Sequence, residues 1–230
     1  MLARPCLALV AVAACHSSAA PPPPPPSDFT YYLLAMTWSP ATKDQCSLPP
    51  ALTLHGLWPN FSEAQAAGKP HAWPEFCGAF AHCAKTEDAA CAPGVPVPPE
   101  LAAVAPAYVS GTLATHEWSK HGSCTRLAPA EFFAAELAAI RSIPTIANLR
   151  PGERALADLQ RAFGVPPESV VLGCSPTCQL TQVAFCLGKD AADHPTGPVS
   201  CTPSVSGSDY DNGCAVRHCD RVQLAATCGT

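Results

Sequence analysis

The sequence predicts an α+β domain that is cross-linked by disulfide bonds, and three observations lead to this expectation. Patterns typical of helices are grouped in the middle of the chain and strand-like patterns lie towards both ends, whereas βαβ units would alternate them. The length of 230 residues, 48% of them apolar, suits one sizeable domain with its own core. Of the 14 cysteines, Cys6 and Cys15 fall in the leader, which leaves an even and dense set typical of disulfides in an exported chain.

Residues 1–20 are typical of a signal peptide. One early arginine, Arg4, precedes an apolar stretch and then small residues. The letters VAAC also fit a bacterial lipoprotein signal, in which Cys15 becomes the lipidated first residue, while ordinary cleavage after Ala14 or Ala20 explains the same letters. We therefore expect an exported protein that is secreted, periplasmic or lipid-anchored on the outside of the membrane. No apolar run reaches the roughly 18 residues that a membrane helix needs.

Residues 21–27 begin with six prolines and are predicted to form a solvated linker. Consecutive prolines favour an extended polyproline helix, which acts as a semi-rigid spacer. The folded domain is expected to cover residues 28–230.

The first half of this domain is expected to open with strands. An aromatic and apolar run from residue 28 to about 38, DFTYYLLAMTW, predicts a buried strand. The segment LTLHGLW, 52–58, reads as a second strand that ends in a turn at Pro59. Residues 62–97 are rich in Gly, Ala, Pro and Cys and predict a long cross-linked loop.

Helices are expected next. Residues 98–110 predict a helix with a kink or break at Pro106. A second helix carries the motif HEWSKHGSC, 116–124, and is predicted to stop at Gly122, a residue suited to the left-handed conformation. A third helix begins near Pro129, with apolar residues on one stripe: Phe133, Leu137 and Ile140.

The last third returns to strands. The segment ERALADLQRAF, 153–163, predicts a helix that is ended by Gly164. SVVLGC, 169–174, and CQLTQVAFCLG, 178–188, are β-like, and a Cys-, Gly- and Ser-rich tail follows them.

The motif HEWSKHGSC concentrates ionisable side chains on one helix. At about 100° per residue, His116 stacks on Lys120 and Glu117 on His121, so that all four groups fit one broad face. Trp118 points elsewhere and is expected to anchor the helix to the core.

Two hydrolytic chemistries fit this motif poorly. The zinc protease signature H-E-x-x-H places its histidines four residues apart, whereas here they are five apart and diverge by about 140° around the helix. No G-x-S-x-G nucleophile motif is present. The CxxxC of Cys174 and Cys178 suits zinc, but an exported chain favours disulfides.

Cleavage of RNA through its own 2′-hydroxyl fits better. It requires a base for that hydroxyl, an acid for the departing 5′-oxygen, and positive charge near the phosphorus. His121 is one imidazole candidate, with Glu117 available to orient it. His55, beside Gly56 and Trp58 at the end of a predicted strand, is the best second one. The net charge of −5 excludes a strongly basic nucleic-acid-binding surface, although protonation of all eight histidines would make the net charge positive.

HGLWP, 55–59, and HEWSKHGSC resemble the two active-site segments of the ribonuclease T2 family, which are secreted endoribonucleases with an α+β fold. The resemblance spans about residues 28–201. It implies a central antiparallel sheet with several packed helices. It also implies that His55 and His121 are the acid–base pair of transphosphorylation, with His121 taken as the base and His55 as the general acid, although the sequence does not fix this order. The products would be 2′,3′-cyclic phosphate and then 3′-phosphate ends.

The resemblance assigns the remaining site residues as well. Glu117 and Lys120 would polarise the phosphate and stabilise the transition state, and His116 would hold phosphate. Trp58 would stack on a base. Asn60 stands where some members have an Asp that helps to read the base, so the base preference stays open.

Further expectations follow from the same resemblance. The substrate would be single-stranded RNA and not DNA, and neither metal nor cofactor would be needed by what would be a monomer. Cys124 would pair with Cys77 and tie the catalytic helix to the loop after HGLWP. The alternative is a catalytically inactive RNA- or partner-binding protein on the same scaffold. Its mark would be the replacement of His55, Lys120 or His121, and none of them is replaced.

Overall fold

An antiparallel sheet organises the molecule in the computed structural model, which describes residues 28–85, 97–109, 112–144, 149–201 and 213–228. Within these residues five strands join in the order β2-β1-β5-β4, with β6 beside β5, and a separate ribbon pairs β3 with β7. All strand pairs are antiparallel. The strands are β1 (Tyr31–Trp38), β2 (Leu52–Asn60), β3 (Gly152–Ala155), β4 (Val170–Cys174), β5 (Leu180–Lys189), β6 (Pro195–Pro198) and β7 (Arg221–Leu224). The leader and linker, with Cys15, lie outside the described residues.

The central strand β1 is buried along its whole length, which explains its nearly continuous apolar sequence. Successive side chains point to opposite faces of the sheet. Tyr32, Leu34 and Met36 belong to the main core, whereas Tyr31 and Leu33 pack with residues of β4 and β5 on the other face.

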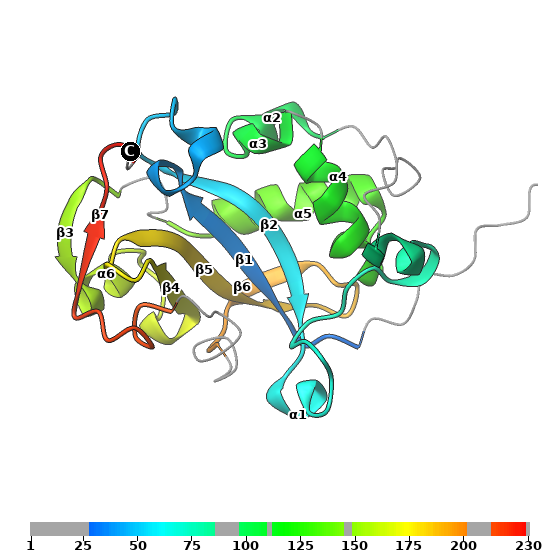
Figure 1. Cartoon of the computed structure of the whole chain (residues 1–230). Coiled ribbons are helices and arrows are strands. Elements are labelled where there is room, and N and C mark those ends of the chain that lie inside the picture. The colour runs from blue at the N-terminus through cyan, green and yellow to red at the C-terminus, as the bar shows by residue number, and fades with distance from the viewer. Residues whose placement is uncertain (1–27, 86–96, 110–111, 145–148, 202–212, 229–230) are drawn as a thin grey trace, which may run out of the picture.

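Helices gather beside the main core, as Figure 1 shows for α2, α3, α4 and α5. Their bounds are α2 (Pro99–Ala102), α3 (Pro106–Val109), α4 (Thr112–Lys120) and α5 (Pro129–Arg141). Each of these helices packs on the main core through a buried side chain: Leu101, Tyr108, Trp118 and Phe133. The predicted break at Pro106, the helix from Pro129 and the core position of Trp118 are therefore confirmed, as is the α+β class.

The second strand does not end at Pro59, and that prediction was wrong. Pro59 and Asn60 continue β2 and pair with Tyr32 and Tyr31 of β1. β2 ends the order of strands in the sheet, where the missing N–H of a proline breaks no ladder bond.

The segment 62–97 is more regular than the predicted loop. Ser62 caps the short helix α1 (Glu63–Ala66) through a capping box with Gln65. Residues 86–96 lie outside the described part of the chain. Short 3₁₀ helices occur here and elsewhere among the described residues: η1 (Ser39–Ala41), η2 (Lys43–Gln45), η3 (Gly78–Lys85), η5 (Gly122–Cys124) and η7 (Pro167–Ser169).

The helix predicted over residues 153–163 is correct only in its second half. Residues up to Ala155 form β3, and the helix α6 (Leu156–Arg161) begins after it. The reason is a distant partner, because β7 pairs with β3 and Arg221 hydrogen-bonds to Glu153. No local pattern reports such a partner.

Gly122 does not adopt the predicted left-handed conformation. It is absent from the glycines with positive φ, and it begins η5 directly after His121. The position needs glycine for space, since a Cβ there would lie 2.5 Å from Cε3 of Trp118 and 3.0 Å from Cδ1 of Phe132.

The described cysteines all form disulfides. Five bonds join pairs within the described residues: Cys46–Cys228, Cys77–Cys124, Cys174–Cys214, Cys178–Cys219 and Cys186–Cys201. Cys174 and Cys178 therefore bind two different partners and are not available to zinc. Cys46–Cys228 ties the C-terminal segment to the loop after β1, near the marked terminus in Figure 1.

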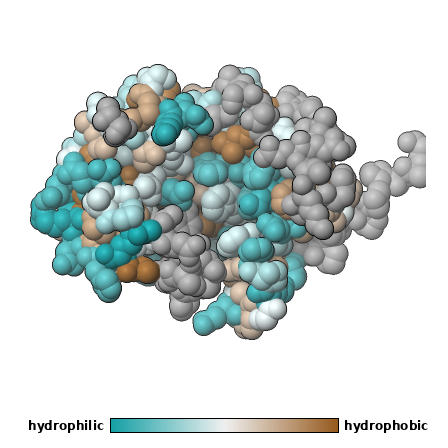
Figure 2. All heavy atoms as spheres, viewed as in Figure 1, coloured by the Kyte–Doolittle hydropathy of each residue, from teal (hydrophilic) through white to brown (hydrophobic). Residues whose placement is uncertain are grey.

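The described surface offers little contiguous apolar area. Figure 2 shows hydrophilic residues over the β3, α6 and β7 side and hydrophobic residues only in separate small areas. The exposed large hydrophobic residues of the described part are Val199 and Val216. No helix that the structure describes has the length and hydropathy to cross a membrane.

Candidate active site

The site forms where β2 meets α4. The indole Nε1 of Trp58 donates a hydrogen bond to Oε2 of Glu117 at 2.7 Å. Gly56 permits this approach, because a Cβ on it would overlap Oε2 of Glu117 and lie 2.6 Å from Nε1 of Trp58. The strand and the helix, which come from segments far apart in the sequence, are thereby held together at one carboxyl group.

His55 reaches the site from a bulge in β2. Ala35 pairs with Gly56 and Met36 with Leu54, so His55 is the extra residue of the strand. A bulge bends the strand and re-aims its side chain. Nε2 of His55 lies 3.6 Å from Oε1 of Glu117, and its side chain is 35% exposed. Its ring meets Trp58 edge to face, with centroids 5.2 Å apart.

His121 lies directly after α4 and is almost fully buried. Its backbone N–H donates to the carbonyl of Glu117 at 3.0 Å, which continues the helical turn. Its ring stacks on Trp58 with centroids 5.2 Å apart and an angle of 24°. Both imidazoles of the expected acid–base pair therefore contact the same indole.

Lys120 and His116 form the outer part of the site and are partly exposed. Nζ of Lys120 lies 4.0 Å from Oε2 of Glu75. The ring of His116 meets Phe76 edge to face, with centroids 6.4 Å apart. Glu75 and Phe76 were missed by sequence reasoning, because they lie in a loop without a motif.

The loop that carries Glu75 and Phe76 is fastened to the end of α4. Phe76 N–H donates to the carbonyl of Lys120 at 2.9 Å, and Cys77 N–H donates to Oγ of Ser123 at 3.0 Å. The disulfide between Cys77 and Cys124 is the pair that the resemblance implied. These bonds fix one wall of the site relative to the helix.

Burial and neighbouring positive charge keep the imidazoles neutral. Burial, with the charges of His116 and Lys120, lowers the pKa of His55 to about 4. Burial also holds the pKa of His121 well below its usual value, and Lys120 is the next cause. Burial raises the pKa of Glu117 to about 8, although Trp58 and Lys120 oppose this shift.

Trp58 and Asn60 occupy the end of β2 beyond His55. Nδ2 of Asn60 donates to the carbonyl of Trp58 at 2.9 Å, and Asn60 is only 3% exposed. Trp58 is partly exposed. Of these two residues, Trp58 is thus the one that a ligand base can reach.

Two buried residues that sequence reasoning missed lie next to the backbone of His55. The hydroxyl of Tyr108 lies 2.9 Å from the carbonyl oxygen of His55 and 3.1 Å from Oε1 of Glu136. Tyr108 is 2% exposed and Glu136 is 0% exposed. Glu136 stands in a mostly apolar helix, where an acidic residue normally indicates a solvent-facing position, so no sequence signal marks it.

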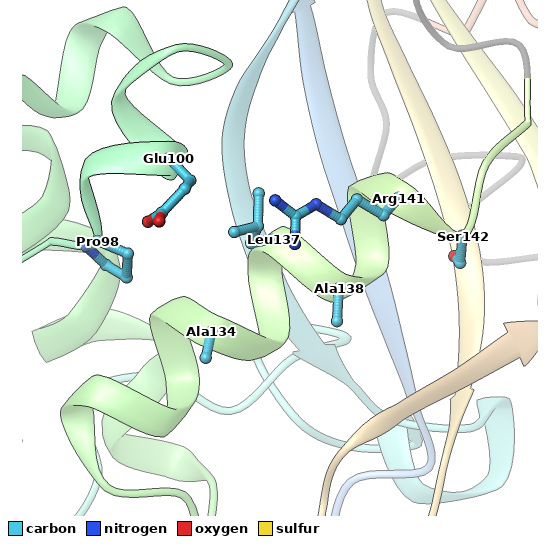
Figure 3. Close-up of a pocket in the computed structure, with 7 residues that line it drawn as sticks. All are labelled: Pro98, Glu100, Ala134, Leu137, Ala138, Arg141 and Ser142. Atoms are coloured by element: carbon cyan, nitrogen blue, oxygen red, sulfur yellow. The ribbon is translucent and has the colours of Figure 1, made fainter.

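Other features of the described residues do not compete with this site. No group of three or more His, Cys, Asp or Glu side chains is arranged there to hold a metal ion. A surface pocket of about 670 Å³ lies between α2 and α5 (Figure 3). Its charged groups are Glu100 and Arg141, and Ser142 lines it, but no imidazole is among its lining residues.

Comparisons with known proteins identify a family to which the sequence is similar. A sequence model described as "Ribonuclease T2 family" matches residues 29–196. A protein named "Ribonuclease" from Aeromonas hydrophila is 31% identical over 112 residues, which are 46% of this chain and 42% of that protein. The chain thus spans less than half the length of this curated relative.

Two solved structures are similar to this chain to nearly the same degree. An RNase-related protein from Calystegia sepium matches with a TM-score of 0.50 and 18% identity, over 85% of this chain and 97% of that one. The self-incompatibility associated SF11-RNase of Nicotiana alata matches with a TM-score of 0.49 and 18% identity, over 76% of this chain and 94% of that one. At this identity the likeness to the first of them supports the fold alone.

Proposed function

Because this chain belongs to the ribonuclease T2 family, we propose that it is a metal-independent endoribonuclease that cleaves single-stranded RNA through the 2′-hydroxyl. The observation that carries the proposal is the contact of both His55 and His121 with Trp58 beside the Glu117 carboxyl. Two imidazoles that contact the same indole suit a reaction in which one proton is removed and another is delivered.

The reaction balances as a transphosphorylation. His121 removes the proton of the 2′-hydroxyl, and the 2′-oxygen forms a bond to phosphorus. The bond to the 5′-oxygen breaks, and the His55 imidazolium gives that oxygen a proton. The product is a 2′,3′-cyclic phosphate, which water then opens to a 3′-phosphate with the roles of the two histidines reversed.

Because the pKa of His55 is lowered to about 4 in the free protein, its role as general acid depends on bound substrate. An imidazolium with a lowered pKa gives up its proton readily, and the negative phosphate of a bound substrate favours the protonated form. His121, whose pKa is also lowered, stays neutral and able to accept a proton. DNA lacks the 2′-hydroxyl and is not a substrate under this proposal.

Lys120, His116 and Glu117 are assigned to the phosphate. The ammonium of Lys120 opposes the charge that develops on the phosphorane oxygens, and His116 beside it holds phosphate. Glu117, with its pKa raised to about 8, is a hydrogen-bond donor to a phosphate oxygen around neutral pH.

Trp58 is assigned to base stacking, which is worth roughly 1–3 kcal/mol in comparable aromatic–base contacts. Asn60 acts at the same subsite by holding the backbone of Trp58, as its bond to the Trp58 carbonyl supports. The base preference is not part of the proposal.

The proposed setting is outside the cytoplasm. Residues 1–20 are assigned as the signal peptide, 21–27 as the linker and 28–230 as the catalytic domain of a monomer, with Cys15 as the alternative lipid anchor. The disulfides between described cysteines support an oxidising compartment.

The test is digestion of a defined RNA with and without a chelator, with the product ends identified by mass. The expected result is 2′,3′-cyclic phosphate and 3′-phosphate ends, no effect of the chelator and no cleavage of the matching DNA. His55→Ala and His121→Ala should each lower kcat at least about a hundredfold, because each removes one proton transfer.

The matched control is His194→Ala, which removes an exposed histidine that pairs with Asp190. It should leave kcat unchanged. Binding of RNA without cleavage by the wild-type protein would instead favour the inactive RNA-binding alternative. Full activity of a folded His121→Ala variant would remove this residue from the mechanism.

A further inference from the structure

The bulge at His55 leaves a backbone group without a ladder partner. His55 is the residue of β2 that has no partner in the register with β1, and a bulge disrupts the ladder hydrogen bonds at such a residue. A buried carbonyl must find a donor elsewhere. Here the hydroxyl of Tyr108, on α3, lies 2.9 Å away and donates to it.

The same hydroxyl also meets a buried carboxyl group. Oε1 of Glu136, on α5, lies 3.1 Å from the Tyr108 oxygen. A tyrosine hydroxyl has one proton to donate. If Glu136 were ionised, its carboxylate would compete for that proton, because charged acceptors form the stronger hydrogen bonds. If Glu136 is neutral, its own O–H donates to Tyr108, and Tyr108 donates to His55.

The surroundings of Glu136 disfavour the ionised form. Burial and the nearby Glu117 carboxyl raise its pKa well above the usual value, and Tyr108 with the backbone of Leu57 opposes this only in part. Oε2 has no hydrogen-bond partner among the described residues. An ionised carboxylate that leaves one buried oxygen without a hydrogen bond is strongly disfavoured.

We propose that Tyr108 and a neutral Glu136 form a hydrogen-bonded relay that positions the general acid His55, and that both are positioning residues of the ribonuclease. This inference rests on the proposed function, since it concerns the placement of His55 during RNA cleavage. The groups that face Glu136 are Tyr108 from α3, Glu117 from α4 and the backbone of β2 at Leu57. The hydrogen bond from Tyr108 holds the backbone of the bulge in place, and the bulge in turn orients the imidazole of His55.

The kinetic test compares three variants on one RNA substrate. Tyr108→Phe removes the donor to His55 and should lower kcat about tenfold or more while KM stays within about twofold, because the acid is misplaced and the phosphate-binding groups are untouched. Glu136→Leu should lower kcat about threefold to tenfold, since the Tyr108 hydroxyl loses its orienting donor. Glu136→Gln, whose amide also donates, should stay within about twofold of the wild type.

A double variant tests whether Glu136 acts through Tyr108. In the Tyr108→Phe background, Glu136→Leu should cause no further loss of kcat, because the group that it orients is already gone. Additive losses would contradict the relay.

The matched control is Tyr32→Phe. Tyr32 is also buried, and its hydroxyl donates to the carbonyl of Asp193 at 2.6 Å, away from His55. This variant should lose stability as Tyr108→Phe does, but its kcat should equal that of the wild type. Equal losses of kcat in both variants would reduce the role of Tyr108 to general stability.

Infrared spectroscopy tests the protonation state without using activity. The wild-type protein at neutral pH should show the carbonyl stretch of a protonated carboxylic acid that Glu136→Gln lacks. Absence of this difference means that Glu136 is ionised and overturns the relay. If no RNA were cleaved by the wild type, the proposed function would fail while this measurement still decides the state of Glu136.

Discussion

At the scale of single residues, Lys120 connects the phosphate-binding and proton-transfer parts of the site. Its charge helps to lower the pKa of His55 and of His121, and it opposes the rise in the pKa of Glu117. Burial is the larger cause in each case. One ammonium therefore biases three titrations in the direction that keeps both histidines neutral and Glu117 more acidic.

Lys120→Met is expected to raise the pKa values of both His55 and His121. Removal of a nearby positive charge favours the protonated imidazole, so the His55 titration should move upwards from about 4 but stay below 6.5, because burial persists. Titration of the histidine ring signals by NMR measures both values. The exposed Lys43→Met variant is the control, and equal titrations in the two variants would exclude Lys120 as a cause.

The sequence identifies the motif residues of the site but not the residues that support them. His55, Glu117, Lys120 and His121 stand in two short segments whose residue types point to proton transfer, and the structure brings them to one place. Tyr108 and Glu136 act, in our proposal, through hydrogen bonds across three elements. A lone tyrosine or glutamate in a helix carries no local sign of such partners.

At the scale of elements, the end of α4 depends on a close packing contact. Trp118 packs against Phe132 with ring centroids 5.8 Å apart, and Gly122 lies against the Trp118 ring. This contact joins α4 and η5 to α5. His121 lies in the chain between α4 and η5, so the contact helps to fix its position. The sequence marks Gly122 as a helix stop, whereas the structure uses it as a gap that the indole fills.

Gly122→Ala is expected to lower the free energy of unfolding by about 1–3 kcal/mol, the usual cost of overpacking a core. The added methyl group would lie 2.5 Å from the Trp118 ring, which has to move. Urea denaturation measures the change. Gly197→Ala is the matched control, because its Cβ meets nothing within 4 Å, and it should change stability by less than about 0.5 kcal/mol. A stable Gly122→Ala variant would show that the helix end can relax.

The boundaries of helices and strands were predicted correctly where a local sequence pattern decides them. The predictions were wrong where pairing with a distant strand or the place in the sheet decides them. The apolar run of β1 and the helix from Pro129 follow directly from periodicity. The extension of β2 through Pro59 depends on its place at the edge of the sheet. The strand at residues 152–155 exists because β7 pairs with it across more than sixty residues of chain.

At the scale of the whole molecule, class and connectivity were predictable to different degrees. The grouping of helices between strands is visible in the sequence and gives the α+β class, which the structure confirms. The pairing of cysteines is not visible, since each pair depends on how distant segments meet. Only Cys77–Cys124 was expected, and that expectation came from the family resemblance.

The buried ionisable groups couple the site to the stability of the whole chain. The raised pKa of Glu117, about 8 in the folded protein, means that the folded state holds a proton that the unfolded state releases above about pH 4.5. Stability associated with Glu117 is therefore lost as pH rises from about 4.5 to about 8. The lowered pKa values of His55 and His121 act oppositely, so that their contribution is lost as pH falls below about 6.5, in the case of His55 down to about 4.

Glu117→Gln is accordingly expected to remove activity and to increase stability relative to the wild type as pH rises. The gain should be absent at about pH 4 and should exceed about 1.4 kcal/mol at pH 8, which is the value of a one-unit pKa shift. Urea denaturation across this pH range measures it, with Glu100→Gln on the exposed surface of α2 as the control. A difference that does not grow with pH would mean that Glu117 is ionised in the folded protein. Its part in the reaction would then be that of a carboxylate that orients His55 rather than that of a donor to the phosphate.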